Sequence, residues 1–254
     1  MKKSLALIII ALLGIGLVNA PAQFGGAGHG AGSPSFGDAT GKLFGEHQTF
    51  SATMEFETGD PVSGHAMTMP GRLIFDNGKS RFEMNMAEMK GAAMPPEAVE
   101  QMKSMGMDRM VSISRPDKKM TYVIYPGMQS YVENPVLEKN GAKTPDDFKV
   151  ETTALGREMA DGHDCLKNKV VVTDKDGKKH ESTVWNAPDM KNFPIKIETT
   201  EAGQSAVMHF KDVAFTKPAA SAFEVPADLK KYPSMPAMIQ EVMMKKMGGM
   251  MPPH

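Results

Sequence analysis

Methionine is the residue in this sequence whose type and spacing could do chemistry. The chain holds 24 methionines in 254 residues, and four of them lie in the stretch EQMKSMGMDRM, at Met102, Met105, Met107 and Met110. A thioether side chain is a flexible, polarizable hydrophobe and also a soft ligand for Cu(I). Three interpretations of this stretch therefore stay open: an ordinary core, a pocket for a hydrophobic ligand, and a copper site.

The segment HAMTM gives copper its best case. In a strand, His65, Met67 and Met69 would point to one face, which puts an imidazole and two thioethers together. Ligands of this kind suit Cu(I). The methionines are, however, spread along the whole chain and form no tight repeat. Copper binding is therefore the alternative to a hydrophobic ligand, and we assign no cofactor.

Catalytic residues are not identified in the sequence. His163 and Cys165 share a strand face, but nucleophilic catalysis needs an accessible thiolate, and a cysteine in a strand is usually a small buried hydrophobe. The sequence has no GxSxG elbow, HExxH motif or phosphate-binding loop. We therefore predict a protein that is not an enzyme.

The N-terminus has the pattern of an export signal. Lys2 and Lys3 precede an apolar run from Leu5 to Val18, and Ala20-Pro21-Ala22 offers a cleavage site after residue 22. We predict a signal peptide over 1–22 and a periplasmic or secreted protein. The Gly-, Ala- and Ser-rich segment 23–47 is predicted to be a flexible leader, because it has little apolar surface to bury.

The composition of the chain limits which partners, covalent links and domain sizes can be expected. The formal net charge is −1, and it becomes about −3 if Lys2 and Lys3 are removed, so no basic field favours a nucleic acid partner. Cys165 is the only cysteine, which excludes an internal disulfide. The length after residue 47 suits one domain with a substantial core. The oligomeric state and the role of Cys165 stay open.

The elements that must position these side chains are mostly strands. FSATMEFET alternates apolar and polar residues from Phe50, as a half-buried antiparallel strand does. Asp76-Asn77-Gly78 predicts a hairpin turn, and turn signals recur along the rest of the chain. About ten or eleven strands with tight connections predict a mainly β (α+β) fold, with one curved antiparallel sheet in the domain 48–233.

Two helices are predicted to cover this sheet. One begins after Pro95-Pro96, carries Val99, Met102 and Met105 on its apolar face, and ends at Gly106. Met107 and Met110 then lead into the next strand. The second helix lies in the methionine-rich tail, 234–254.

Five segments of the chain carry a family resemblance: MPGRLIFDNGKSRFEM, MVSISRPDKKMTYVIYPGMQSYVE, ALGREMADGHDCLKNKV, VWNAPDMKNFPIKIE and FEVPADLKKY. Together they resemble an exported bacterial family of unknown function that is related to the LolA/LolB lipoprotein-carrier superfamily. The resemblance implies a half-open antiparallel β-barrel whose concave side is capped by helices and holds a cavity for acyl chains. It carries over no catalytic motif. The arginine of the carriers' cavity has three candidates here, Arg72, Arg81 and Arg109.

We therefore predict a non-catalytic envelope protein that binds a hydrophobic or lipid-like ligand between a curved sheet and lid helices. Its partners would be a lipid or acyl chain and an envelope protein. A structural or interaction protein with a filled core is the further alternative. The predicted pocket residues are Met54, Phe56, Leu73, Phe75, Phe82, Met84, Val99, Met102, Met105, Tyr122 and Trp185.

Overall fold

A computed structural model of the chain describes residues 39–59, 67–91, 96–135, 148–201 and 204–248. The predicted signal peptide lies outside these residues, so cleavage and export stay predictions. Within the described residues, no helix is long and apolar enough to cross a membrane.

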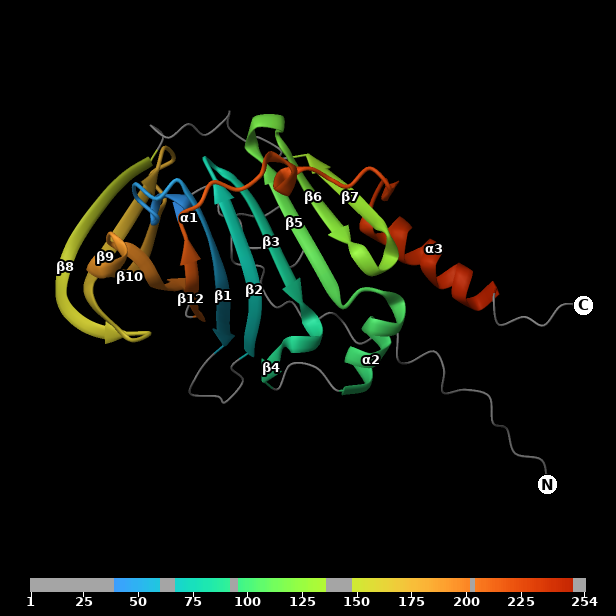
Figure 1. The fold of residues 1–254 in the computed structure, drawn as a ribbon, viewed down its shortest axis with the longest axis horizontal. Coiled ribbons are helices and arrows are strands. Elements are labelled where there is room, and N and C mark those ends of the chain that lie inside the picture. The colour runs from blue at the N-terminus through green and yellow to red at the C-terminus, as the bar shows by residue number, and fades with distance from the viewer. Residues whose placement is uncertain (1–38, 60–66, 92–95, 136–147, 202–203, 249–254) are drawn as a thin grey trace, which may run out of the picture.

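The described strands form one strongly curved sheet (Figure 1). They are β1 (Thr49–Gly59), β2 (Met67–Asp76), β3 (Lys79–Asn85), β4 (Lys90–Gly91), β5 (Arg109–Arg115), β6 (Met120–Tyr125), β7 (Ser130–Pro135), β8 (Phe148–Ala160), β9 (His163–Asp174), β10 (Lys179–Ala187), β11 (Phe193–Glu201), β12 (Gln204–Ala214) and β13 (Lys230–Tyr232). Their order is β13-β7-β6-β5-β3-β2-β1-β12-β11-β10-β9-β8, with β4 beside β2. The mainly β, curved antiparallel architecture predicted from the sequence is confirmed.

The strand count exceeds the predicted ten or eleven because two strands are very short. Residues 39–248, where described, hold 13 strands in the sheet, of which β4 has two residues and β13 three. So short a strand has no measurable alternation of apolar and polar residues. β13 also pairs with β7 in parallel, whereas the other pairs along the sheet are antiparallel.

The β2–β3 hairpin and the two longer helices form where the sequence predicts them. Asn77 and Gly78 have φ of 48° and 82°, as the turn requires. Helix α2 (Pro96–Met105) ends at Gly106 with φ 71°, and the Met107 N–H donates to the Met102 carbonyl at 2.9 Å. Helix α3 (Met235–Gly248) begins after Ser234, whose hydroxyl accepts from the Ala237 N–H at 3.3 Å.

The largest group of buried side chains, here called the phenylalanine core, lies inside the curled half of the sheet. It joins β1 and β2 to β9–β12. Phe44 is 1% exposed, and its ring centroid lies 4.8 Å from that of Phe50 and 5.5 Å from that of Phe210. Such aromatic contacts add to the stabilisation from burial alone.

Part of the segment predicted as a flexible leader is thus packed. Residues 39–47 hold the short helix α1 (Ala39–Lys42), and Leu43 and Phe44 are buried behind it. The prediction was wrong for these residues. It rested on the average composition of the whole segment, which is polar and rich in glycine, and gave too little weight to the apolar side chains of Leu43 and Phe44 near its end. Residues 23–38 lie outside the described part of the chain.

The strands β5, β6 and β7 are covered on both faces. Val111, Ile113 and Ile124 pack on one face against Phe223 of the short helix η6 (Ala220–Phe223). The alternate residues of the same strands, Met110 among them, point to the opposite face because successive side chains alternate. That opposite face carries the candidate site.

Candidate functional site

Seven methionines converge on the face of β5–β7 opposite η6. We call them, with the aromatic and aliphatic residues that they contact, the methionine cluster. Its buried members are Met110, Tyr125, Val132, Tyr232 and Met238, and its half-buried members are Met84, Met86, Met107, Val123, Met128 and Met235. These side chains come from β3, β5–β7, β13, α3, η1 (Met86–Glu88), η3 (Pro126–Met128) and the α2–β5 connection.

Strand pairing forms the floor of the cluster. Met84 on β3 lies directly opposite Met110 on β5, and Val123 on β6 lies opposite Val132 on β7. Directly paired residues in an antiparallel sheet have their Cβ atoms about 5 Å apart on one face. Burial raises the pKa of the Tyr125 phenol, so this polar group in the cluster stays protonated and neutral at physiological pH.

Helix α3 covers one side of the cluster through few residues. Met238 is fully buried and Met235 is half-buried against the strands, whereas Met244 is 59% exposed. A two-pronged ion pair from Lys230 Nζ to the Glu241 carboxylate, at 2.6 and 2.8 Å, ties the helix to β13. Met238 is the one fully buried side chain among those described on α3, and the ion pair to β13 is partly exposed to solvent, where such a pair adds little stability.

Helix α2 lies at another side, beside η1 and the β6–β7 turn. Figure 1 places α2 and α3 at the end of the sheet that carries β5–β7, away from the curled end. Its apolar residues Val99, Met102 and Met105 are half-buried, and Met107 after its C-terminus joins the methionine cluster. The helix boundary at Gly106 therefore separates two methionines on the helix from two in the cluster, as the sequence predicts.

The residues of the predicted pocket lie in four places. Most of those on strands are fully buried in the phenylalanine core: Met54, Phe56, Leu73, Phe75 and Phe82. Met84 touches both the phenylalanine core and the methionine cluster, while Val99, Met102 and Met105 sit on α2. The structure thus brings Met84 and the α2 residues to the methionine-rich end and packs the five strand residues elsewhere.

Tyr122 lies apart from the rest, whereas Trp185 joins the five strand residues in the phenylalanine core. Tyr122 packs with Ile113 on the η6 side of the sheet, opposite the methionine cluster. Trp185 is 2% exposed within the phenylalanine core, and the ammonium groups of Lys167 and Lys196 lie 4.9 and 4.3 Å from its ring centroid. The alternation of side chains along a strand does not by itself show which face of the sheet a residue lies on, because bulges shift the alternation and both faces of this sheet are covered by other elements at β5–β7.

Within the part of the chain that it describes, the structure does not show the predicted copper ligands His65, Met67 and Met69 gathered in one site. His65 lies outside the described residues, and Met67 and Met69 are half-buried on β2, with Met69 packed on the phenylalanine core. Among the residues that the structure describes, no three His, Cys, Asp or Glu side chains are placed to hold a metal ion. The thioethers that converge are those of the methionine cluster.

The candidate arginines of the sequence do not enter the cluster. Arg72 and Arg109 are exposed. Arg81 donates from Nε to Glu83 at 2.6 Å and from Nη1 to the Ala222 carbonyl at 3.2 Å, so its guanidinium lies on the η6 side. The structure therefore selects none of the three for a ligand in the methionine cluster.

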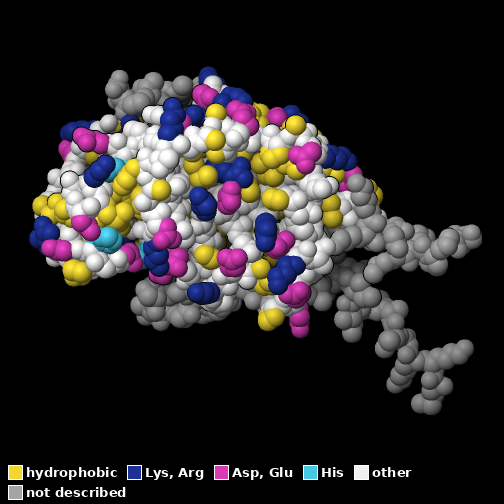
Figure 2. Space-filling model, viewed as in Figure 1, with side chains coloured by type: hydrophobic (Ala, Val, Ile, Leu, Met, Phe, Trp, Pro, Cys, Tyr) yellow, Lys and Arg dark blue, Asp and Glu magenta, His cyan; other side chains and the backbone are white. Residues whose placement is uncertain are grey.

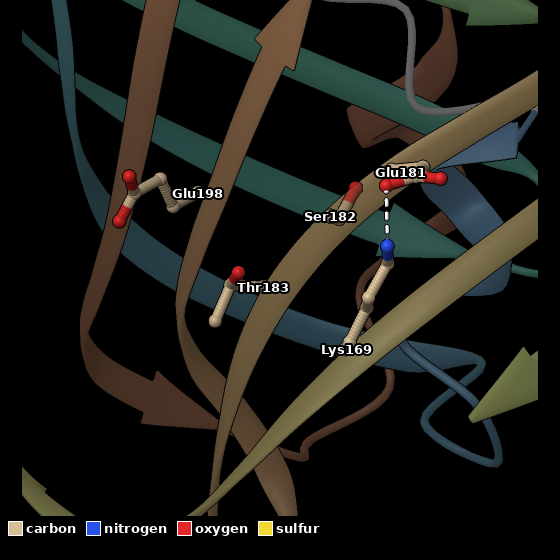
Figure 3. A pocket seen from close by; sticks show the side chains of 5 residues that line it. All are labelled: Lys169, Glu181, Ser182, Thr183 and Glu198. Carbon is tan, nitrogen blue, oxygen red and sulfur yellow. Dashed lines mark ion pairs between the residues drawn. The ribbon is translucent and has the colours of Figure 1, made fainter. Parts of the chain in front are cut away.

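A second, polar hollow lies on β9–β11 (Figure 3). It has a volume of about 230 Å³ and is lined by Lys169, Glu181, Ser182, Thr183 and Glu198. Lys169 and Glu181 are paired in it at 2.6 Å. Charged and hydroxyl groups on every side make it unsuited to an acyl chain, because each would lose hydration without a partner.

Comparison with known proteins gives structural similarity only. No protein-family model matches the chain, and no curated protein matches it. Among solved structures, it is similar to a LolA superfamily protein from Nitrosomonas europaea, with 11% identity, 75% of this chain and 96% of that chain covered, and a TM-score of 0.36.

Two mycobacterial structures are similar to the same extent. LprF from Mycobacterium bovis has 12% identity over 79% of this chain and all of that chain, with a TM-score of 0.38. The lipoprotein LppX from Mycobacterium tuberculosis has 13% identity over 69% of this chain and 89% of that chain, with a TM-score of 0.36.

The methionine cluster was missed by sequence reasoning. Its members span residues 84 to 238, and six separate segments supply the seven methionines. The one local signal is the alternation of Met84 and Met86, because a strand after the DNG hairpin must place both on one face. The pairing of Met84 with Met110 depends on the register between β3 and β5, which no local pattern contains.

Proposed function

We propose that this protein is a non-catalytic binding protein for a hydrophobic, lipid-like ligand, which it holds at the methionine cluster between β5–β7 and the helices α2 and α3. The observation that carries the proposal is the convergence of seven methionines beneath α3 and beside the C-terminal end of α2. Methionine side chains can rearrange around ligands of varied shape at low cost. A cluster meant only to fill space would gain more from branched side chains with fixed rotamers.

The binding energy would come from burial. Each methylene of an acyl chain that leaves water contributes about 0.8 kcal/mol. Movement of α3 would expose Met110, Tyr125 and Val132, which are buried now, and the chain of the ligand would take the place of Met235 and Met238. Release would then require a membrane or a partner that offers the ligand comparable burial.

The site of action follows from the proposed export. A carrier of this kind would work in the periplasm or outside the cell, after loss of residues 1–22. The formal charge near zero and the mixture of basic and acidic side chains on the face seen in Figure 2 suit a protein that acts on an apolar chain and not on nucleic acid.

Copper is the second candidate because the same cluster gathers thioethers. Three or four sulfur ligands are a suitable set for Cu(I). Four of the cluster's methionines, Met84, Met86, Met107 and Met110, come from the strands β3 and β5 or their flanking residues. A copper protein would bind Cu(I) tightly at a fixed stoichiometry, whereas a lipid carrier would not.

The test is the content of the protein after gentle purification. Lipids are extracted from the detergent-free full-length chain and identified by mass spectrometry, and a parallel sample is titrated with Cu(I) under a competing chelator. Co-purified acyl lipid near one equivalent supports the proposal. Tight stoichiometric Cu(I) binding without lipid selects the second candidate, and binding of neither, together with a rigid interior, selects a structural role.

A further inference from the structure

Strand β8 is the long outer edge of the sheet. All of its 13 residues except Leu155 pair with β9, and within the described ranges of the chain no strand pairs with its other edge. All residues from Lys149 to Met159 are exposed, among them Val150 at 43%, Leu155 at 53% and Met159 at 65%. The end of the molecule that carries β8–β10 shows hydrophobic side chains at its surface (Figure 2).

An exposed edge of this length is a template for another strand. Its backbone N–H and C=O groups can form a new ladder, and natural proteins block such edges with charges, bulges or short strands. β8 has a bulge between Ala154 and Gly156, where Gly156 has φ 123°. The bulge interrupts the second half of the edge and leaves the first half, Phe148–Ala154, regular.

The side chains of this first half are complementary to themselves. If two copies pair antiparallel with Val150 on the two-fold axis, Lys149 lies opposite the partner's Glu151, and the contact occurs twice. Val150 lies opposite the partner's Val150. In the chain itself Val150 pairs with the buried Val172 of β9, so the apolar row would run unbroken across the axis.

Neighbouring registers either lack opposite-charge pairs on the regular half of the strand or are interrupted. An axis at Thr152 would oppose Glu151 and the partner's Thr153, so it forms no ion pair. An axis at Glu151 would oppose two glutamates, and an axis at Lys149 would oppose two lysines, which is destabilising on an exposed sheet face. An axis at Thr153 would place Lys149 opposite the partner's Arg157. An axis at Ala154 would oppose Glu151 and the partner's Arg157, but it would cross the bulge. The Val150 register is therefore preferred.

We propose that two copies of this protein associate through the first half of β8, in antiparallel register about Val150, and so join their sheets into one. The ion pair between Lys149 and Glu151 within each chain, at 2.7 Å, is exposed at 74% and 52% and can exchange for two pairs between the chains. Because the contact is one strand deep, the association is concentration-dependent and weak. The methionine-rich ends point away from it, so both ligand sites stay accessible.

A charge-exchange cycle tests the register. The full chain is measured by sedimentation equilibrium from about one micromolar to about one millimolar, the range in which weak dimers form. Lys149→Glu and Glu151→Lys each place like charges opposite one another, and each is expected to raise the dimer dissociation constant about tenfold or more. The double variant K149E/E151K restores two opposite-charge pairs and recovers the wild-type constant.

Lys211→Glu is the matched control, because Lys211 also pairs with a glutamate on an exposed strand face, Glu55, but lies on β12 in the interior of the sheet. It should leave the constant unchanged. A wild-type protein that is monomeric throughout overturns the proposal. Equal effects of the single and double variants overturn it as well.

Disulfide cross-linking at the two-fold axis tests the register of the dimer independently. Val150→Cys puts two thiols on facing residues, within the Cα separation that a disulfide spans, while Thr153→Cys puts them about 20 Å apart along the strands. The native Cys165 is buried and does not compete. Under mild oxidation the first variant is expected to form covalent dimers and the second is not. Equal cross-linking of both contradicts the register.

Discussion

The backbones of Gly106 and Gly127 are in direct contact. A Cβ added to Gly106 would lie 2.6 Å from the carbonyl carbon and oxygen of Gly127, closer than real side chains come. Gly106 ends α2 and Gly127 lies in η3, between β6 and β7. The pair therefore fixes the end of α2 against the strands that carry the methionine cluster.

Alanine at Gly106 should disturb this contact. Gly106→Ala combines a positive φ with a steric clash, whereas Gly78→Ala has a similar φ of 82° and open space around it. The φ alone costs roughly 1–2 kcal/mol, and overpacking adds about 1–3 kcal/mol. Urea unfolding should therefore give a larger loss of stability for G106A than for G78A. Equal losses would mean that α2 can shift freely away from η3.

Phe44 should contribute strongly to stability despite its place near the end of a polar segment. Phe44→Ala removes a ring that is 1% exposed and contacts the rings of Phe50, Phe75, Phe193 and Phe210, so we expect a loss of about 3–5 kcal/mol. Phe215→Ala is the control, because Phe215 is 37% exposed. Thermal or urea unfolding checks both, and similar losses would contradict the packed position of residues 43–44.

Arg115 should make stability depend on pH in the acid range. It donates to both carboxylate oxygens of Asp117, at 2.9 and 2.7 Å, to the Phe223 carbonyl at 3.1 Å, and to Glu224. The hydrogen bond from Arg115 lowers the pKa of Asp117, and those from Lys118 and Arg115 lower the pKa of Glu224. A lowered carboxyl pKa stabilises the fold above the ordinary value near 4 and loses this effect as pH falls below it.

Arg115→Gln should therefore cost more at neutral pH than in acid. We expect about 1–3 kcal/mol at pH 7, since Arg115 is 8% exposed and its partners would lose charged hydrogen bonds. The loss should shrink near pH 3, because the carboxyl groups of the unfolded chain and of the variant then take up protons and the advantage of the lowered pKa values in the wild type falls. Urea unfolding at the two pH values measures it. A loss that is equal or larger at pH 3 would contradict the role given to Asp117 and Glu224.

The apolar face of α2 should matter for ligand retention. Met102→Lys with Met105→Lys places two charges at half-buried positions beside the methionine cluster, whereas Gln101→Lys with Ser104→Lys changes two exposed positions of the same helix. We expect the first pair to lower the amount of co-purified lipid several-fold and the second pair to leave it unchanged. If the first pair alters neither lipid content nor stability, those side chains neither line a pocket nor pack a core.

Local chemistry explains why much of the fold could be predicted from the sequence. Asn77-Gly78 tolerates the positive φ of a tight hairpin, and Gly106 ends a helix for the same reason, so both positions are readable without knowledge of the rest. The alternation in β1 likewise fixes that Phe50, Ala52, Met54 and Phe56 are buried together.

The candidate site could be predicted only in part, because it depends on pairings between distant segments. Met84 and Met110 meet through strand register, and Met238 reaches them from a helix more than 120 residues later. The position of Tyr122 on the η6 side depends on β5–β7 having covers on both faces, which alternation does not reveal. Phe44 escaped notice because the segment around it is polar and rich in glycine.

The central claim is that the ligand binds at the methionine cluster, and NMR of the methionine methyl groups tests it most directly. The chain is labelled with ¹³C at these methyls, assigned by Met→Leu variants, and titrated with a long-chain fatty acid below its micelle concentration. We predict saturable shifts for Met84, Met107, Met110, Met128, Met235 and Met238, and none for Met54 and Met208, which are fully buried in the phenylalanine core. Shifts confined to Met54 and Met208, or no saturable shifts at all, would contradict the account.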